Sequence, residues 1–156
     1  MNVIRTLLYV TLLAGLIALL LPAVDVTQPA PSATMQTVGG VMIVAGVALA
    51  LWCAFTFAVI GRGTPLPFDP PRRLVVTGPY RFVRNPMAIG AGLALFGVAA
   101  LYQSLALLVF AGVFMLVIHT FVILYEEPTL RRTFGADYEA YCANVNRWLP
   151  RRPTTG

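Results

Sequence analysis

Charge is scarce in this sequence. Asp, Glu, Lys and Arg make up only 11% of its 156 residues, while 58% are hydrophobic and the mean hydropathy is +0.79. Soluble domains carry about 25% charged residues, so this composition excludes an ordinary soluble domain. We predict an all-α integral membrane protein that forms a single domain over residues 1–156.

Motifs for several common chemistries are also missing. The two cysteines, Cys53 and Cys142, have neither pairing nor metal-ligand spacing, so we interpret them as packing residues in a reducing compartment. The single histidine, His119, belongs to no metal cluster or nucleophilic triad. Gly90-Ala91-Gly92 is too short to indicate a dinucleotide site, and no phosphate-binding glycine loop occurs.

Four long apolar runs are present instead. A helix needs about 20 apolar residues to cross a bilayer, and the third run has only 15, or about 22 Å of helix. We therefore expect the third and fourth runs to form a helical hairpin turning at 102–104, with one arm partly shielded by protein. The four predicted spans are Val3–Val24, Val38–Ile60, Met87–Leu101 and Leu105–Tyr125.

The N-terminus resembles a secretory signal peptide, since Arg5 precedes an apolar run and small residues follow at 30–33. The apolar part of a signal peptide has about 7–15 residues, and this run is longer. We expect it to remain as the first span.

The eleven basic residues, all arginines, predict the orientation. One lies at the N-terminal edge of the first span, five lie between the second and third, five follow the fourth, and the other two loops have none. They are Arg5; Arg62, Arg72, Arg73, Arg81 and Arg84; and Arg131, Arg132, Arg147, Arg151 and Arg152. Positive residues favour the cytoplasmic side, which predicts a bacterial-type inner-membrane protein with both termini in the cytoplasm. Because the arginines form no single patch, the net charge of +5 does not indicate nucleic-acid binding.

Two acids and two arginines meet at one end of the predicted hairpin. Glu126 and Glu127 directly follow the last apolar run, and Arg81 and Arg84 precede the third. They either form an ion-pair belt at the headgroups or line one site, because a buried carboxylate needs a partner. His119, seven residues before Glu126, is expected on the same helical face, as a satisfied structural residue or as part of that site.

Other polar residues have structural interpretations beside functional ones. Asn85-Pro86 is a good helix start, and Gly90 and Gly92 suit close helix packing in a membrane. A short helix from Asp137 to about Asn144 is expected to be amphipathic and to lie along the membrane surface, with Asp137 capping its start. Its apolar stripe consists of Tyr138, Tyr141 and Val145.

Two segments resemble a known family. "GPYRFVRNPMAIG" and "LYEEPTLRRTFGADYEAYCANVNRWLP" are similar to the membrane methyltransferases that include isoprenylcysteine carboxyl methyltransferases and phospholipid N-methyltransferases. The resemblance covers about Gly78–Pro150 and implies an S-adenosylmethionine-dependent methyltransferase acting on a lipophilic acceptor, with the C-terminal helix capping a cofactor pocket. It implies cofactor contacts from Arg84, Asn85, Pro86, Met87, Gly90, Glu126, Glu127 and Tyr141. It also matches four C-terminal residues to the cap: Tyr138, Tyr141, Arg147 and Trp148.

The resemblance is not complete. Many members have His and Tyr where this chain has Asn85 and Ala88. Asn before Pro-Met, together with "LYEEP", looks closer to the phospholipid branch, whereas "FGADY" and the following Tyr look closer to the carboxyl methyltransferase branch. The acceptor, whether oxygen, nitrogen or sulfur, stays open.

The predicted mechanism is direct methyl transfer in which Arg84 and Glu127 hold the reactants and His119 or a tyrosine takes a proton from an amine acceptor. One alternative is an NADPH-dependent membrane reductase of the sterol reductase type, with the C-terminal arginines attracting a phosphate. The other is a non-catalytic small membrane protein whose Arg and Glu residues only anchor helix ends.

Overall fold

A computed structural model describes residues 32–60 and 74–150. The described residues do not include the predicted first span Val3–Val24 or the signal-like segment. They also leave out six of the arginines: Arg5, Arg62, Arg72, Arg73, Arg151 and Arg152. Within the described residues every regular element is helical, which confirms the all-α prediction. The elements are α2 (Ala33–Ile60), the 3₁₀-helix η2 (Gly78–Arg81), α3 (Pro86–Tyr102), α4 (Leu105–Phe121), the π-helical turn η3 (Val122–Glu126), α5 (Glu127–Phe134) and α6 (Ala136–Asn144).

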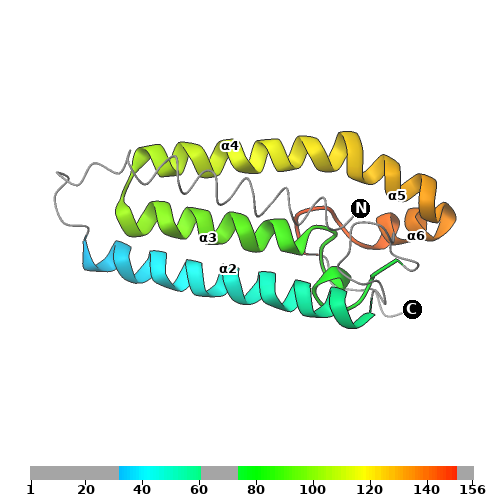
Figure 1. Cartoon of the computed structure of the whole chain (residues 1–156), viewed down its shortest axis with the longest axis horizontal. Coiled ribbons are helices and arrows are strands. Elements are labelled where there is room, and N and C mark those ends of the chain that lie inside the picture. The colour runs from blue at the N-terminus through cyan, green and yellow to red at the C-terminus, as the bar shows by residue number, and fades with distance from the viewer. Residues whose placement is uncertain (1–31, 61–73, 151–156) are drawn as a thin grey trace.

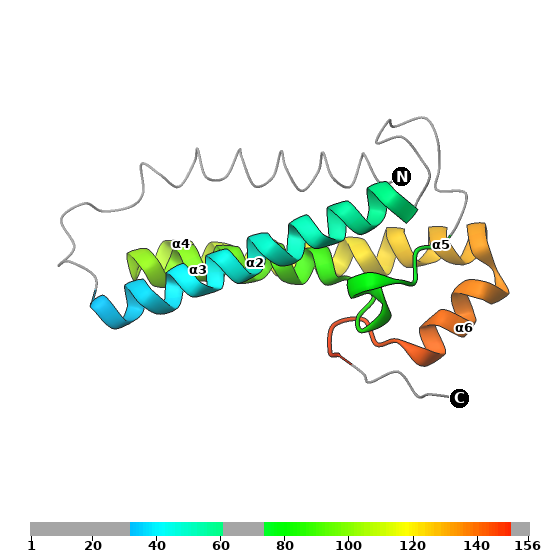
Figure 2. The same cartoon turned by 90° about the horizontal axis from the view of Figure 1, so that it is seen from below.

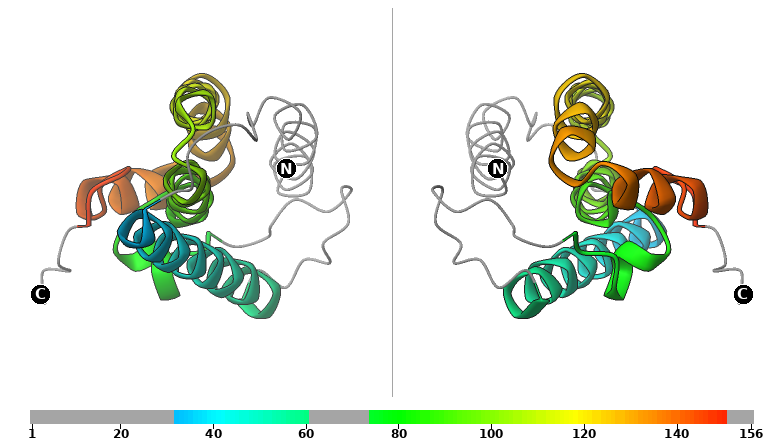
Figure 3. Two further views of the ribbon diagram at one scale, coloured as in Figure 1. Left: turned by 90° about the vertical axis from the view of Figure 1, so that its left-hand side faces the viewer. Right: turned by 90° about the vertical axis from the view of Figure 1, so that its right-hand side faces the viewer.

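The three long helices lie side by side, with α3 between α2 and α4 (Figures 1 and 3). The hairpin turns where it was expected: Gln103 ends α3 in a left-handed conformation with φ 48°. The Ser104 side chain then caps α4 by accepting a hydrogen bond from the Leu107 N–H at 3.4 Å. Packing on both sides shields α3, as predicted for one arm of the hairpin.

Paired glycines set the distance between α2 and α3. A Cβ at Gly46 would lie 2.5 Å from the carbonyl oxygen of Gly90, and a Cβ at Gly39 would lie 2.6 Å from that of Gly97. Each pair repeats after seven residues, so the antiparallel helices touch backbone to backbone at two successive levels. This contact confirms the packing interpretation of Gly90. Gly92 faces the other way, where its Cβ would lie 2.5 Å from the sulfur of Met115 on α4.

The outer surfaces of α2 and α4 are apolar and exposed. Val44 and Phe55 on α2 are 69% and 68% exposed, and Leu116 on α4 is 64% exposed. Ala33–Thr56 and Leu105–Phe134 are long and apolar enough to cross a membrane, and most of each is exposed rather than buried in a protein core. Such surfaces suit lipid as the solvent. The third predicted span is a shorter apolar helix.

The last long helix bends where the apolar run ends. The predicted span stops at Tyr125, but the helical path continues through η3 and α5 to Phe134 (Figure 1). Pro128 lies just past the π-helical turn; it has no N–H to donate to the carbonyl of Leu124, and its ring crowds that carbonyl. Pro and a π-helical turn are recognised causes of a helix kink.

The predicted C-terminal helix is present as α6, which folds back beneath α5 after Gly135, whose φ is +51° (Figure 2). Its apolar stripe differs from expectation. Tyr138 and Val145 are only 2% and 8% exposed, so the stripe packs against the protein instead of lying along a membrane surface. Asp137 lies in the first turn, and α6 begins without a side-chain cap hydrogen bond.

The glycine contact predicts opposite effects on stability for alanine substitutions at two glycines of α2. Gly46→Ala places a methyl group against the backbone of α3 and is expected to destabilise the fold by about 1–3 kcal/mol. Gly40→Ala meets no atom of the described residues within 4 Å, so its higher helix propensity should stabilise by up to about 1 kcal/mol. Unfolding midpoints in detergent measure both, and equal shifts would contradict the close approach.

Candidate active site

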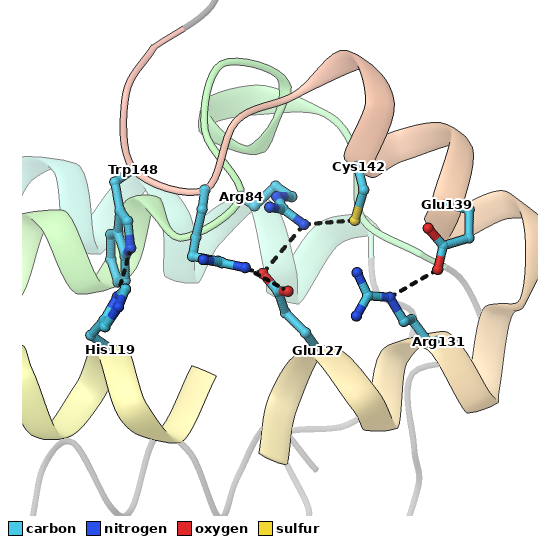
Figure 4. A network of polar contacts seen from close by, with 8 residues as sticks. Arg84, His119, Glu127, Arg131, Glu139, Cys142 and Trp148 are labelled. Carbon is cyan, nitrogen blue, oxygen red and sulfur yellow. Dashed lines mark hydrogen bonds and ion pairs between the residues drawn. The ribbon is translucent and has the colours of Figure 1, made fainter. Parts of the chain in front are cut away.

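One buried carboxylate joins three parts of the chain. Glu127, only 4% exposed, accepts hydrogen bonds from Arg147 Nε at 2.6 Å and Arg147 Nη2 at 2.9 Å. Arg84 Nη1 lies 3.3 Å from the same carboxylate (Figure 4). The hairpin's two arms and the segment after α6 therefore meet at Glu127. This confirms the prediction that Arg84 and Glu127 come together.

Each ionised group in this cluster stabilises the charged form of its neighbours. A buried carboxylate without a partner is strongly unfavourable, and a bidentate guanidinium is its best-matched partner. The hydrogen bond to Glu127 raises the pKa of Arg147, so this side chain stays cationic. Arg84 also donates from Nη1 to Cys142 Sγ at 2.6 Å, and its buried Nε has no hydrogen-bond partner among the described residues.

Two further contacts hold the C-terminal segment on the start of α3. The Arg84 N–H donates to the Asn146 carbonyl at 2.9 Å, and the Tyr141 hydroxyl donates to the Tyr80 carbonyl at 2.6 Å. Burial raises the pKa of Tyr141, which therefore remains a neutral hydrogen-bond donor. Tyr141, expected among the cofactor contacts, here fixes α6 against η2.

His119 contacts Trp148. Trp148 Nε1 donates to His119 Nδ1 at 3.0 Å, and the two ring centroids are 5.8 Å apart (Figure 4). An α-helix turns about 100° per residue, which would align His119 with Glu126. The π-helical turn between them adds one residue per turn, so the alignment moves to Glu127. His119 and Glu127 accordingly contact adjacent residues of one segment, Trp148 and Arg147, while the expected pairing of His119 with Glu126 stays a prediction.

The other two predicted charged residues, Glu126 and Arg81, differ in their exposure to solvent. Glu126 is buried, with 6% exposure, beside Glu127 in the sequence. Arg81 is exposed, and its guanidinium carbon lies 4.6 Å from the centroid of the Phe82 ring. Arg81 therefore does not join the Glu127 cluster.

The predicted Asn-Pro start of α3 is confirmed, with Pro86 as the first helical residue. Asn85 precedes it with 3% exposure and makes no side-chain cap hydrogen bond. Met87 packs towards α2 with Cys53, and Gly90 contacts the α2 backbone. Arg84 and Asn85 therefore lie at the polar end of the hairpin, whereas Met87 and Gly90 pack α3 against α2.

Sequence reasoning missed the main partner of Glu127. Arg147 lies 20 residues away, in a segment with no periodic pattern, and Cys142 was interpreted as a packing residue. The available signal was an Arg-Trp pair directly after a short helix with a buried apolar stripe. Over residues 32–60 and 74–150, no group of three His, Cys, Asp or Glu side chains is placed to hold a metal ion.

A family model described as phospholipid methyltransferase matches residues 34–137, well over half of the chain. The match contains α2, the hairpin, Arg84 and Glu127, and it ends before Cys142, Arg147 and Trp148. No curated protein and no solved structure gives a significant match.

Neutralising Glu127 should loosen the cluster. Glu127→Gln keeps the shape but leaves Arg84 and Arg147 without an anionic partner, which should lower the free energy of unfolding by about 1–3 kcal/mol. Glu139→Gln is the matched control, because it breaks only the exposed Arg131–Glu139 pair, and exposed ion pairs contribute little to stability. Unfolding midpoints in detergent provide the comparison, and equal losses would show that Glu127 does not hold the segment.

Proposed function

We propose that this chain, which belongs to the phospholipid methyltransferase family, transfers a methyl group from S-adenosylmethionine to a lipophilic acceptor. The observation that carries the proposal is the buried Arg84–Glu127–Arg147 cluster at the end of an apolar hairpin. A water-soluble, charged cofactor can reach this end from the aqueous phase, while an apolar acceptor can approach through lipid along the exposed faces of α2 and α4.

The residues at this end fit the polar groups of S-adenosylmethionine. The buried, unpartnered Nε of Arg84 suits a carboxylate, which guanidinium groups bind in a bidentate manner. Glu126 and Glu127 supply carboxylates that can accept hydrogen bonds from ribose hydroxyls or from an ammonium group. Asn85, buried beside Arg84, adds an amide to the same set.

When bound, the cofactor would supply an electrophilic methyl group on its sulfonium. Displacement at that carbon discharges a cation, so the reaction depends on alignment and on exclusion of water more than on acid catalysis. Arg84 and the two glutamates would orient the donor. The C-terminal segment, held by Arg147 and Tyr141, would keep water away from the reacting atoms.

We also propose that the polar end faces the cytoplasm. The described arginines lie on η2, the start of α3, α5 and the segment after α6, which gather at one end of the bundle (Figure 1). Such clustering is typical of the cytoplasmic side. For the acceptor, the family description favours a phospholipid amine over an isoprenylcysteine carboxylate.

Cofactor binding is the first test. Purified protein in lipid nanodiscs should bind S-adenosylhomocysteine with micromolar affinity and should not bind NADPH. Glu126→Gln and Glu127→Gln should weaken binding at least about tenfold, since each removes a charged acceptor, while Glu139→Gln should not. Calorimetric titration of monodisperse protein measures all five cases. Full binding by both site variants would contradict the assignment, and binding of NADPH alone would favour a reductase.

Methyl transfer distinguishes the acceptors. With labelled S-adenosylmethionine, nanodiscs containing phosphatidylethanolamine should yield labelled phospholipid, and Arg84→Ala should reduce this rate at least about tenfold through loss of alignment. Vesicles of phosphatidylcholine alone are the control, because that headgroup has no free amine. Label in an added isoprenylcysteine, with none in the amine lipid, would reassign the acceptor.

A further inference from the structure

Trp148 occupies one of the two nitrogens of His119. The indole N–H donates to Nδ1, and an accepting nitrogen carries no proton, so the neutral imidazole holds its hydrogen on Nε2. Neither nitrogen then has a lone pair available for a proton from an acceptor substrate. As long as the Trp148 hydrogen bond persists, His119 is not arranged as a general base.

The neighbour of Trp148 in the sequence is the main partner of Glu127. Arg147 and Trp148 contact the bent helix at Glu127 and His119, on either side of the π-helical turn. Trp148 also packs against the core cluster between α3 and α4, which includes Ile118. Both residues of the segment lie beyond the part of the chain that matches the family model.

We propose that His119 and Trp148 are a positioning pair: their hydrogen bond fixes the segment after α6 so that Arg147 stays against Glu127. The inference rests on the proposed function, because the site that the pair orders is the proposed cofactor site. His119 thereby acts through Trp148 and Arg147 and does not touch the reacting atoms.

The first test needs no cofactor, because Cys142, in the last turn of α6 directly before the segment, reports on how tightly the segment is held. Its sulfur contacts Arg84 and is partly buried, whereas Cys53 is fully buried and serves as an internal reference. Trp148→Phe keeps a ring but removes the donor, His119→Leu removes the acceptor, and His119→Gln retains an acceptor oxygen. Trp52→Phe, at an exposed site on α2, is the matched control.

Maleimide labelling of Cys142, followed by mass spectrometry, should be about two- to tenfold faster in Trp148→Phe and His119→Leu, as expected for the loss of one hydrogen bond. His119→Gln and Trp52→Phe should match the wild type. Equal rates in all five proteins would overturn the proposal.

Binding and turnover then separate positioning from catalysis. A positioning pair predicts that Trp148→Phe weakens S-adenosylhomocysteine binding about two- to tenfold and that His119→Gln retains both binding and turnover. A general base predicts the reverse: His119→Gln would lose about 10²–10⁴-fold in turnover while Trp148→Phe would keep it, and this result would overturn the proposal.

The two tests also distinguish failure of the inference from failure of the proposed function. If the wild type does not bind S-adenosylhomocysteine but the Cys142 rates follow the expected order, the proposed function fails and the pair still holds the segment. If the wild type binds and the Cys142 rates are all equal, the proposed function stands and the positioning role fails.

Discussion

A carboxylate enclosed by protein has to be matched by cations, and much of the polar end of this molecule follows from how Glu127 meets that requirement. Arg84 and Arg147 come from segments far apart in the sequence, so satisfying one acid brings together the start of α3, the start of α5 and the segment after α6. The Arg84 N–H then donates to the Asn146 carbonyl of the same segment, and the Tyr141 hydroxyl fixes α6, just before it, at the Tyr80 carbonyl.

Two features of the backbone allow Arg84, Glu127 and Arg147 to meet. The glycines of α2 and α3 permit contact between the helix backbones, which places the start of α3 and its Arg84 relative to the bundle. The π-helical turn before Pro128 shifts the register of the last helix by one residue, so that His119 and Glu127 face the same segment. A regular helix would direct Glu126 there instead.

The bundle therefore has an apolar surface along its length and a charged region at one end. Along α2 and α4 the exposed side chains are aliphatic and aromatic, which suits lipid. At the end where η2, α5 and α6 gather, charged groups pair with one another. A methyltransferase with a polar donor and an apolar acceptor needs both surfaces to meet at one place.

The features that depend on local pattern could be predicted from the order of the amino acids. Apolar runs defined α2 to α4, Asn85-Pro86 marked the start of α3, Gln103 and Ser104 marked the turn, and the order of the spans brought Arg84 near Glu127. Three other features became visible only in the folded molecule. Arg147 is the bidentate partner of Glu127, Trp148 binds His119, and Tyr138 of α6 is buried. These contacts join residues with no periodic relation, and they depend on a change of helical register that side-chain spacing alone does not reveal.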